Sequence, residues 1–194
     1  MKKIALAFIV LFVHAVGYSQ FYKSVLPNPE FSSALEKIVL AYRLDYHTIQ
    51  VDSIFSPEDG YESYGSSVKL PGSINCEILR FHSDDDTTSA FHANFYQGED
   101  FASASKAYEN CIAMIKRSRM RWVDRRTFSF TGQTVKASEN IGFTVSTLYL
   151  NKDQLDDARY NGFCAEVEIR GNVTGWEVNV SFHLKRSDTE GPTE

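Results

Sequence analysis

The chain has 194 residues with three cysteines, and 43% of its residues are hydrophobic, 13% aromatic and 23% charged. This composition excludes collagen-like, low-complexity and intrinsically disordered chains, and three cysteines are too few for a small disulfide scaffold. The formal net charge of −5 disfavours a nucleic-acid partner, because an acidic surface repels the phosphate backbone. A chain of this length fits one domain, which buries roughly 70% of its unfolded surface without needing a cross-link.

The N-terminal segment has the layout of a secretory signal peptide. A basic start, Met1–Lys3, precedes an apolar run over Ile4–Val13, which is shorter than the roughly 20 residues that span a membrane. Small residues offer cleavage after Gly17 or after Ser19, and we favour Ser19, so that residues 1–19 are removed. Two of the 20 basic residues leave with this segment, so 18 remain against 25 acidic ones and the net charge becomes −7. The mature chain is expected to contain no membrane span.

The Lys-Lys start and the Ser-Gln junction resemble the signal segments of exported proteins of the Bacteroidota. The resemblance covers this segment alone and implies no activity. It adds to the expectation that the protein is exported and is periplasmic or extracellular. After the signal we expect a single α+β domain over residues 20–186 and a flexible tail over residues 187–194.

Two segments have the signals of amphipathic helices. Asn28 and Pro29 form a helix start, and apolar residues at helical spacing then predict a helix over residues 29–46. A second helix is predicted to open at Gly98–Asp100 with an acidic first turn and to end near Arg117, where basic residues suit its negative end. Each helix has one apolar stripe, so each is expected to cover part of a sheet.

The other patterns favour strands. A loop is predicted over residues 56–67, which contain Pro57, Gly60, Gly65 and several serines. The expected strands lie over residues 67–82, 88–96, 127–135, 141–150, 162–170 and 176–185. Pro71-Gly72 interrupts the first of these or marks its true start, and residues 47–55 are either a short strand or an extended approach. Because apolar and polar residues alternate along them, one sheet face is covered and the other is solvated, as in antiparallel sheets. The predicted fold class is therefore α+β and two-layer, with an antiparallel sheet of five to seven strands and two amphipathic helices on one face.

Basic residues are concentrated between Lys116 and Arg126, where Asp124 is the single acid. Arginine with a neighbouring aromatic ring suits anionic polymers, phosphates or carboxylates. The alternative is a helix end followed by a strand whose cations pair with the abundant acids. The candidate partner-binding residues are Arg119, Arg121, Trp122, Arg125 and Arg126, together with Tyr61 and Tyr64 of the predicted Gly/Ser loop.

The polar sides of the strands offer one candidate acid–base site. His92 and His183 lie on polar sides, and Glu166 and Glu168 share a side about 6.6 Å apart along their strand. If these strands are neighbours, the open face brings these groups together, although any solvated sheet face shows such alternation. The acidic run Asp84–Asp86 favours a solvated hairpin tip over a calcium site, because adjacent acids cannot all face one ion.

Dinucleotide, P-loop, serine-hydrolase, zincin and Cys-x-x-Cys motifs are absent, so no catalytic, metal or cofactor residue is assigned. Cys76, Cys111 and Cys164 fit buried small residues, one disulfide with a leftover thiol, or a reactive thiol that lacks an evident His partner. The sequence favours an exported, non-enzymatic binding or accessory module of the cell envelope, with a protein or an anionic envelope ligand as its partner. The alternative is a hydrolase-type enzyme with an acid–base site on the open sheet face.

Overall fold

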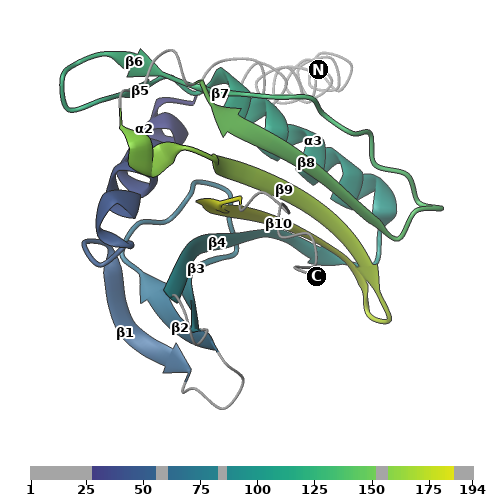
Figure 1. The fold of residues 1–194 in the computed structure, drawn as a ribbon. Helices are drawn as coiled ribbons and strands as arrows, with labels where there is room; N and C mark the ends of the chain where they lie inside the picture. Colours follow the sequence, from purple (N-terminus) through teal and green to yellow (C-terminus); the bar gives the residue numbers. More distant parts are fainter. Residues whose placement is uncertain (1–27, 56–60, 83–86, 152–156, 186–194) are drawn as a thin grey trace, which may run out of the picture.

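The computed structural model describes residues 28–55, 61–82, 87–151 and 157–185 (Figure 1). The predicted signal over residues 1–19, the acidic run Asp84–Asp86 and the predicted tail over residues 187–194 lie outside these ranges. The described elements are α2 (Pro29–Ala41), a 3₁₀ helix (Tyr42–Leu44), β1 (Gln50–Phe55), β2 (Tyr61–Ser66), β3 (Asn75–His82), β4 (Thr87–Gly98), α3 (Phe101–Arg117), β5 (Met120–Arg121), β6 (Thr127–Phe128), β7 (Phe130–Thr131), β8 (Phe143–Leu150), a 3₁₀ helix (Ala158–Tyr160), β9 (Phe163–Asn172) and β10 (Gly175–Leu184).

One antiparallel sheet dominates the fold. Its eight strands follow the order β1-β2-β3-β4-β10-β9-β8-β7, while β5 and β6 form a separate hairpin. The predicted α+β class with an antiparallel sheet is confirmed, but the expected strand number of five to seven is too low. α3 lies behind β8–β10 in Figure 1 and packs on one face of the sheet. Within the described residues, no helix is long and apolar enough to cross a membrane.

The first helix begins at the cap that the sequence predicts, whereas α3 begins after Asp100 and lacks the predicted acidic first turn. The Asn28 side chain accepts hydrogen bonds from the backbone N–H groups of Glu30 and Phe31, at 3.0 and 3.2 Å. Asp100 caps α3 by accepting from Ser103 N at 2.8 Å. The first helix is shorter than predicted: the α-helix ends at Ala41 and only a 3₁₀ turn follows. The chain then turns away through Asp45 and Tyr46, which have positive φ angles of 48° and 62°.

The predicted loop over residues 56–67 is wrong for Tyr61–Ser66, which form β2. Glycine and serine weaken a strand on their own, but β2 is hydrogen-bonded to β1 on one side and β3 on the other. The Tyr61 ring also contacts that of Phe81, with centroids 5.9 Å apart. Strand formation here is set by pairing with the flanking strands β1 and β3, which outweighs local composition. The predicted strand over 127–135 is likewise two short strands in different sheets, β6 and β7.

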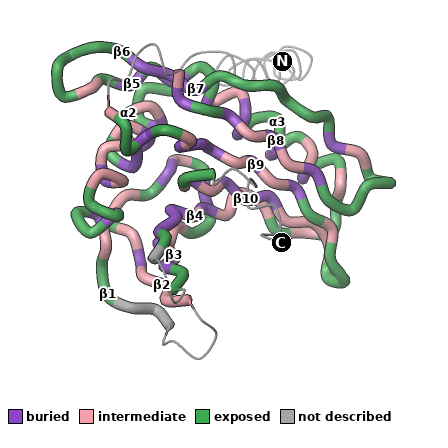
Figure 2. The backbone as a smooth tube through the Cα atoms, in the orientation of Figure 1, coloured by how far each residue is buried: buried purple, intermediate pink, exposed green. Residues whose placement is uncertain are grey.

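The buried side of the sheet faces the helices. Burial alternates along β8 and β9, as the tube in Figure 2 shows. Tyr46 reaches across this core, and its buried hydroxyl donates to the backbone oxygen of Phe182 at 2.8 Å. Tyr42, which follows α2, packs on Phe163 of β9 with ring centroids 4.6 Å apart. The first helical segment and α3 therefore contact the same face, and the other face is left open.

A β-bulge in β4 changes which side chains reach that core. Asn94 pairs with Asn179 and Tyr96 pairs with Val178, so Phe95 between them has no partner on β10. Uninterrupted alternation would place Tyr96 on the open face with Asn94. The extra residue instead shifts Tyr96 to the apolar side, where both it and Phe95 pack against the core.

Candidate functional site

Part of the predicted basic cluster forms a hairpin at one end of the molecule, which we call the arginine hairpin (Arg119, β5, β6 and the turn between the two strands). Its turn is closed by two backbone hydrogen bonds, from Trp122 N to Arg126 O at 2.7 Å and from Arg125 N to Trp122 O at 2.8 Å. Arg125 adopts a positive φ of 70°. A hairpin closed in this way presents its side chains in a defined order.

Trp122 anchors this hairpin to the core. Its ring meets those of Phe128 and Tyr160 edge-on, with centroids 5.5 and 5.1 Å away. Met120, on the same side of β5, is fully buried. The guanidinium of Arg43 lies over the Trp122 ring, 5.7 Å from its centroid. Trp122 therefore positions the hairpin and does not project from it into solvent.

The arginines face the opposite way. Arg119, which directly precedes β5, and Arg121 alternate with buried residues, and both are exposed. Arg126 is paired with Asp124 of the same turn at 2.6 Å. Within the described part of the chain, the guanidinium groups of Arg119, Arg121 and Arg125 have no hydrogen-bond or ion-pair partner. Of the four candidate arginines, Arg126 is therefore the one whose guanidinium pairs with an acid within the described residues, as the alternative interpretation expected for all of them.

The two tyrosines of the predicted set are not part of this surface. Tyr61 and Tyr64 lie on β2, at the far end of the sheet from the arginine hairpin (Figure 1). They point to opposite faces, because they are three positions apart on a strand. Tyr64 packs against the core beneath Arg80, whose guanidinium lies 5.5 Å from its ring centroid, and its hydroxyl donates to Glu62 at 2.6 Å.

The open sheet face brings together the polar residues that the sequence suggested. β4, β10 and β9 are adjacent in the sheet, so the strands carrying His92, His183 and Glu166 are neighbours. In register, Ser181 lies directly between His92 and Glu166. The two histidines nevertheless belong to separate ion pairs: His92 contacts Glu77 at 3.2 Å and His183 contacts Glu166 at 3.1 Å.

The first pair lies between β3 and β4. Glu77 also accepts a hydrogen bond from the Ser63 hydroxyl at 2.8 Å. The hydrogen bond from His92 lowers the pKa of the Glu77 carboxyl below its ordinary value, and the Ser63 bond adds to this against the opposing effect of partial burial. The ionised carboxylate is thus the form that the folded protein stabilises.

Glu77→Gln is expected to lower the free energy of unfolding at neutral pH by about 0.5–1 kcal/mol, as for a solvent-screened pair. Because the folded-state pKa is lowered, this contribution is present above the unfolded-state pKa of about 4.3 and is lost as pH falls through the folded-state pKa. Urea unfolding of both proteins at neutral and acidic pH measures the change. Glu109→Gln, at an exposed position of α3, is the control. A loss that is the same at both pH values contradicts the prediction.

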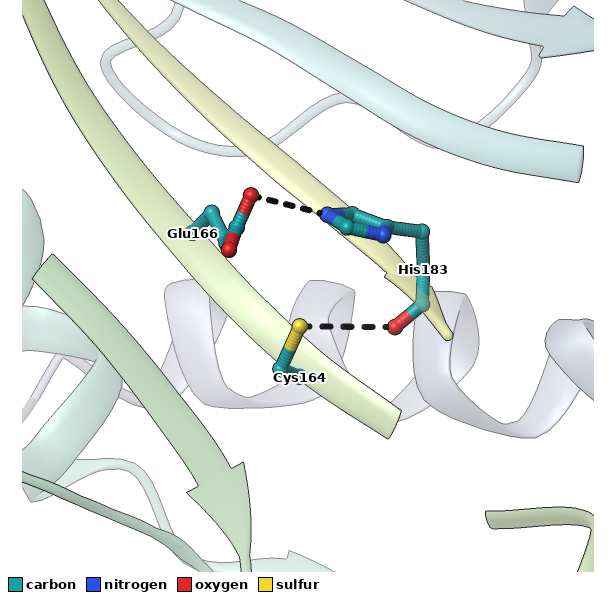
Figure 3. Close-up of side chains that lie close together, drawn as sticks. All are labelled: Cys164, Glu166 and His183. Carbon is teal, nitrogen blue, oxygen red and sulfur yellow. Dashed lines mark hydrogen bonds and ion pairs between the residues drawn. The ribbon is translucent and has the colours of Figure 1, made fainter. Parts of the chain in front are cut away.

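The second pair lies in a denser cluster formed by Cys164, Glu166 and His183, whose donor atoms are all within 4.8 Å of one another (Figure 3). His183 is directly opposite Cys164 in the β9–β10 register, and Glu166 is two residues further along β9. Lys185 and Thr147 hold the other carboxylate oxygen of Glu166, at 2.9 and 3.2 Å. Cys164 donates its thiol proton to the backbone oxygen of His183, at 3.6 Å.

From the sequence, Cys164 has no evident His partner; the structure places the His183 imidazole within 4.8 Å of its thiol, although the thiol hydrogen bond goes to the His183 backbone oxygen. The alternation along the strand predicts that Cys164 and Glu166 lie on one side of it. The register that brings His183 beside them cannot be predicted from the sequence. Burial, with the nearby charge of Glu166, raises the pKa of Cys164 to about 12. The thiol therefore stays protonated at neutral pH and is a poor nucleophile. None of the three cysteines is in a disulfide.

The electrostatics and the spacing of Glu77 and Glu166 give little support for general acid catalysis by these two carboxyl groups. Partial burial would raise the pKa of Glu166, but the hydrogen bond from Lys185 and the charge of His183 outweigh it and lower that pKa. A general acid needs the opposite shift. Glu77 and Glu166 are separated by three strand spacings, about 14 Å, beyond the range of a glycosidase pair.

Two surface cavities have volumes of about 480 and 490 Å³, and the second is lined in part by Lys116 and Arg117 of the predicted basic cluster. The first is lined by α2 and residues 67–69, and the second by α3 and residues 134–136. Neither is lined by a histidine of the open face or by Arg119, Arg121 or Arg125.

The fold and its exposed groups define the chain as an α+β protein with an open polar sheet face and a projecting arginine hairpin. Comparison with protein-family models, curated proteins and solved structures gives no match.

Proposed function

We propose that the protein is an exported, non-enzymatic binding module that recognises an anionic polymer of the cell envelope through its arginine hairpin. One observation carries the proposal: the backbone of the arginine hairpin is held in place, while three of its guanidinium groups have no partner within the described residues. Trp122 holds the hairpin against Phe128 and Tyr160. The Glu36 carboxylate accepts the backbone N–H of Arg121 at 2.6 Å, but the guanidinium groups of Arg119, Arg121 and Arg125 have no acidic partner within the described residues. The basic leader and the short apolar run at the N-terminus support export.

The charges of the open sheet face differ from those of the arginine hairpin, and this difference supports the hairpin as the binding surface. There the charges are neutralised within the protein: Glu77 with His92, Glu166 with His183 and Lys185, and Arg170 with Glu177 at 3.0 Å. An incoming charged ligand would have to break these contacts. The arginines of the hairpin need no such exchange, and their guanidinium groups suit carboxylate or phosphate oxygens arranged along a polymer.

The hydrolase-type alternative has weaker support, because the pKa values of Glu77 and Glu166 are lowered, whereas a general acid requires a raised pKa. The lowered pKa of Glu166 and the separation of the two Glu–His pairs both count against it.

Replacing Arg119, Arg121 and Arg125 together with serine is expected to weaken binding to a polyanion about tenfold or more, since three exposed ionic contacts of about 0.5–1 kcal/mol each add to at least that factor. Polygalacturonate and inorganic polyphosphate are suitable probes for carboxylate and phosphate recognition. Isothermal titration calorimetry at two salt concentrations measures the affinity, which should fall with salt because the contacts are exposed.

A matched variant removes three exposed lysines elsewhere, Lys69, Lys106 and Lys136, and so has the same net charge. It should keep most of the affinity. If the two triple variants lose affinity equally, binding depends on net charge and not on the hairpin. If the unmodified protein binds neither probe, the proposal is wrong.

A further inference from the structure

We propose that Cys164, Glu166 and His183 on the open sheet face form a binding site for Zn²⁺. The three residues project from the same side of β9 and β10. Both strands are internal to the sheet, paired on each side, so the backbone beneath the three side chains is fixed. Their donor atoms, a sulfur, a nitrogen and a carboxylate oxygen, lie within 4.8 Å of one another (Figure 3).

The donor set selects the kind of metal. Ca²⁺ and Mg²⁺ bind oxygen ligands, and a thiolate with an imidazole does not suit them. Zn²⁺ accepts sulfur, nitrogen and oxygen together, in tetrahedral sites with three or four protein ligands. Glu166 and His183 are each about one quarter exposed. Solvent can therefore reach the cluster and supply a fourth ligand.

The distances require only small side-chain movements. Zinc–ligand bonds of about 2.0–2.3 Å in a tetrahedron separate neighbouring donor atoms by about 3.4–3.6 Å. His183 Nε2 and Glu166 Oε2 are already 3.1 Å apart. The sulfur must approach them from within the 4.8 Å limit, a shift that rotation of Cys164 and Glu166 can provide.

Surrounding hydrogen bonds orient the ligands. His183 Nδ1 lies 3.1 Å from the backbone oxygen of Leu184, which favours a proton on Nδ1 and directs Nε2 toward the cluster. Thr147 and Lys185 donate to Glu166 Oε1, so Oε2 is the oxygen that faces His183. Lys185 is 44% exposed and can move outward when a cation binds. Zn²⁺ would take the place of the proton between Nε2 and Oε2 and of the thiol proton of Cys164, both of which pass to solvent.

The other Glu–His pair of the same face provides an internal comparison. Glu77 and His92 are 3.2 Å apart, but Ser63 and not a cysteine completes their surroundings. Cys76 is in register with Ala93, a buried residue of the apolar side. An ordinary Glu–His ion pair should not retain zinc, so His92→Ala serves as a matched control for His183→Ala.

Titration of the reduced protein with Zn²⁺ against a chromophoric chelator tests the site. We expect one zinc per chain, with affinity at least about tenfold lower in Cys164→Ser and His183→Ala and unchanged in His92→Ala. With Co²⁺ as the probe, the wild type should show a thiolate-to-cobalt charge-transfer band that Cys164→Ser lacks. The conservative serine variant is the main test because it preserves the packing, and its circular dichroism spectrum verifies that it is folded.

Absence of zinc uptake by the wild type overturns the proposal, as does equal uptake by Cys164→Ser or a cobalt spectrum without the thiolate band. The arginine hairpin contributes no ligand to this cluster, so failure of the zinc site leaves polyanion binding untouched and the reverse is also true.

Discussion

Phe182→Ala is expected to lower the free energy of unfolding by about 3–5 kcal/mol, the range for removing a large ring from a closely packed core. Phe182 is fully buried in β10, near the middle of the sheet. Its ring lies 6.1 Å from that of Phe91 and 6.0 Å from that of Phe130. The cavity left by alanine is therefore bounded by groups on other strands that cannot all close in. Urea unfolding followed by circular dichroism measures the loss.

The preceding residue provides the control for this prediction. Ser181 is on the same strand but on the open face, opposite His92 and Glu166. Ser181→Ala should change the free energy of unfolding by about 0.5 kcal/mol or less, because it removes no apolar contact. Similar losses for the two substitutions would mean that the assigned faces of β10 are wrong.

Trp122→Ala is expected to lower the free energy of unfolding by about 2–3 kcal/mol, somewhat below the range for a fully buried tryptophan, since its side chain is half-buried. The larger consequence is for binding. Without the contacts to Phe128 and Tyr160, the arginine hairpin is no longer held in one conformation. Polyanion affinity should then fall by about tenfold although every arginine is still present, because ordering the hairpin opposes association.

Trp176→Ala distinguishes a local effect from general destabilisation. Trp176 is also half-buried and packs on an aromatic ring, that of Phe101 at 4.8 Å, but it lies far from the hairpin at the start of β10. It should cost comparable stability and leave the affinity unchanged. Equal affinities for the two alanine variants would show that anchoring by Trp122 is irrelevant to recognition, and Trp122→Phe should restore part of the loss.

The features that the sequence predicted well are those determined by nearby residues. The first helix is capped by Asn28 as expected, since a cap acts on backbone groups two or three residues away, and α3 begins close to the predicted Gly98–Asp100 start. The density of arginine between Lys116 and Arg126 also marked a surface feature correctly, because charge is excluded from the core.

The features that it predicted poorly depend on pairing between strands and on its register. β2 is a strand because β1 and β3 flank it, which its glycines and serines do not disclose. The Cys164, Glu166 and His183 cluster likewise depends on the register of β9 against β10. A slip of one residue in that register would turn His183 to the opposite face. The inward direction of Trp122 was also missed, because a half-buried tryptophan and an exposed one look the same in a list of residues.

The strand order also bears on how the sheet assembles. Every pair of adjacent strands in the eight-stranded sheet joins consecutive segments of the chain, except β4 with β10. The sheet is therefore two meanders, β1–β4 and β7–β10, joined along one seam that includes Phe91 and Phe182. Closing this seam brings together the parts most distant in sequence, and such long-range closure is slow compared with hairpin formation. We therefore expect the two meanders to form early and the β4–β10 seam to limit the folding rate.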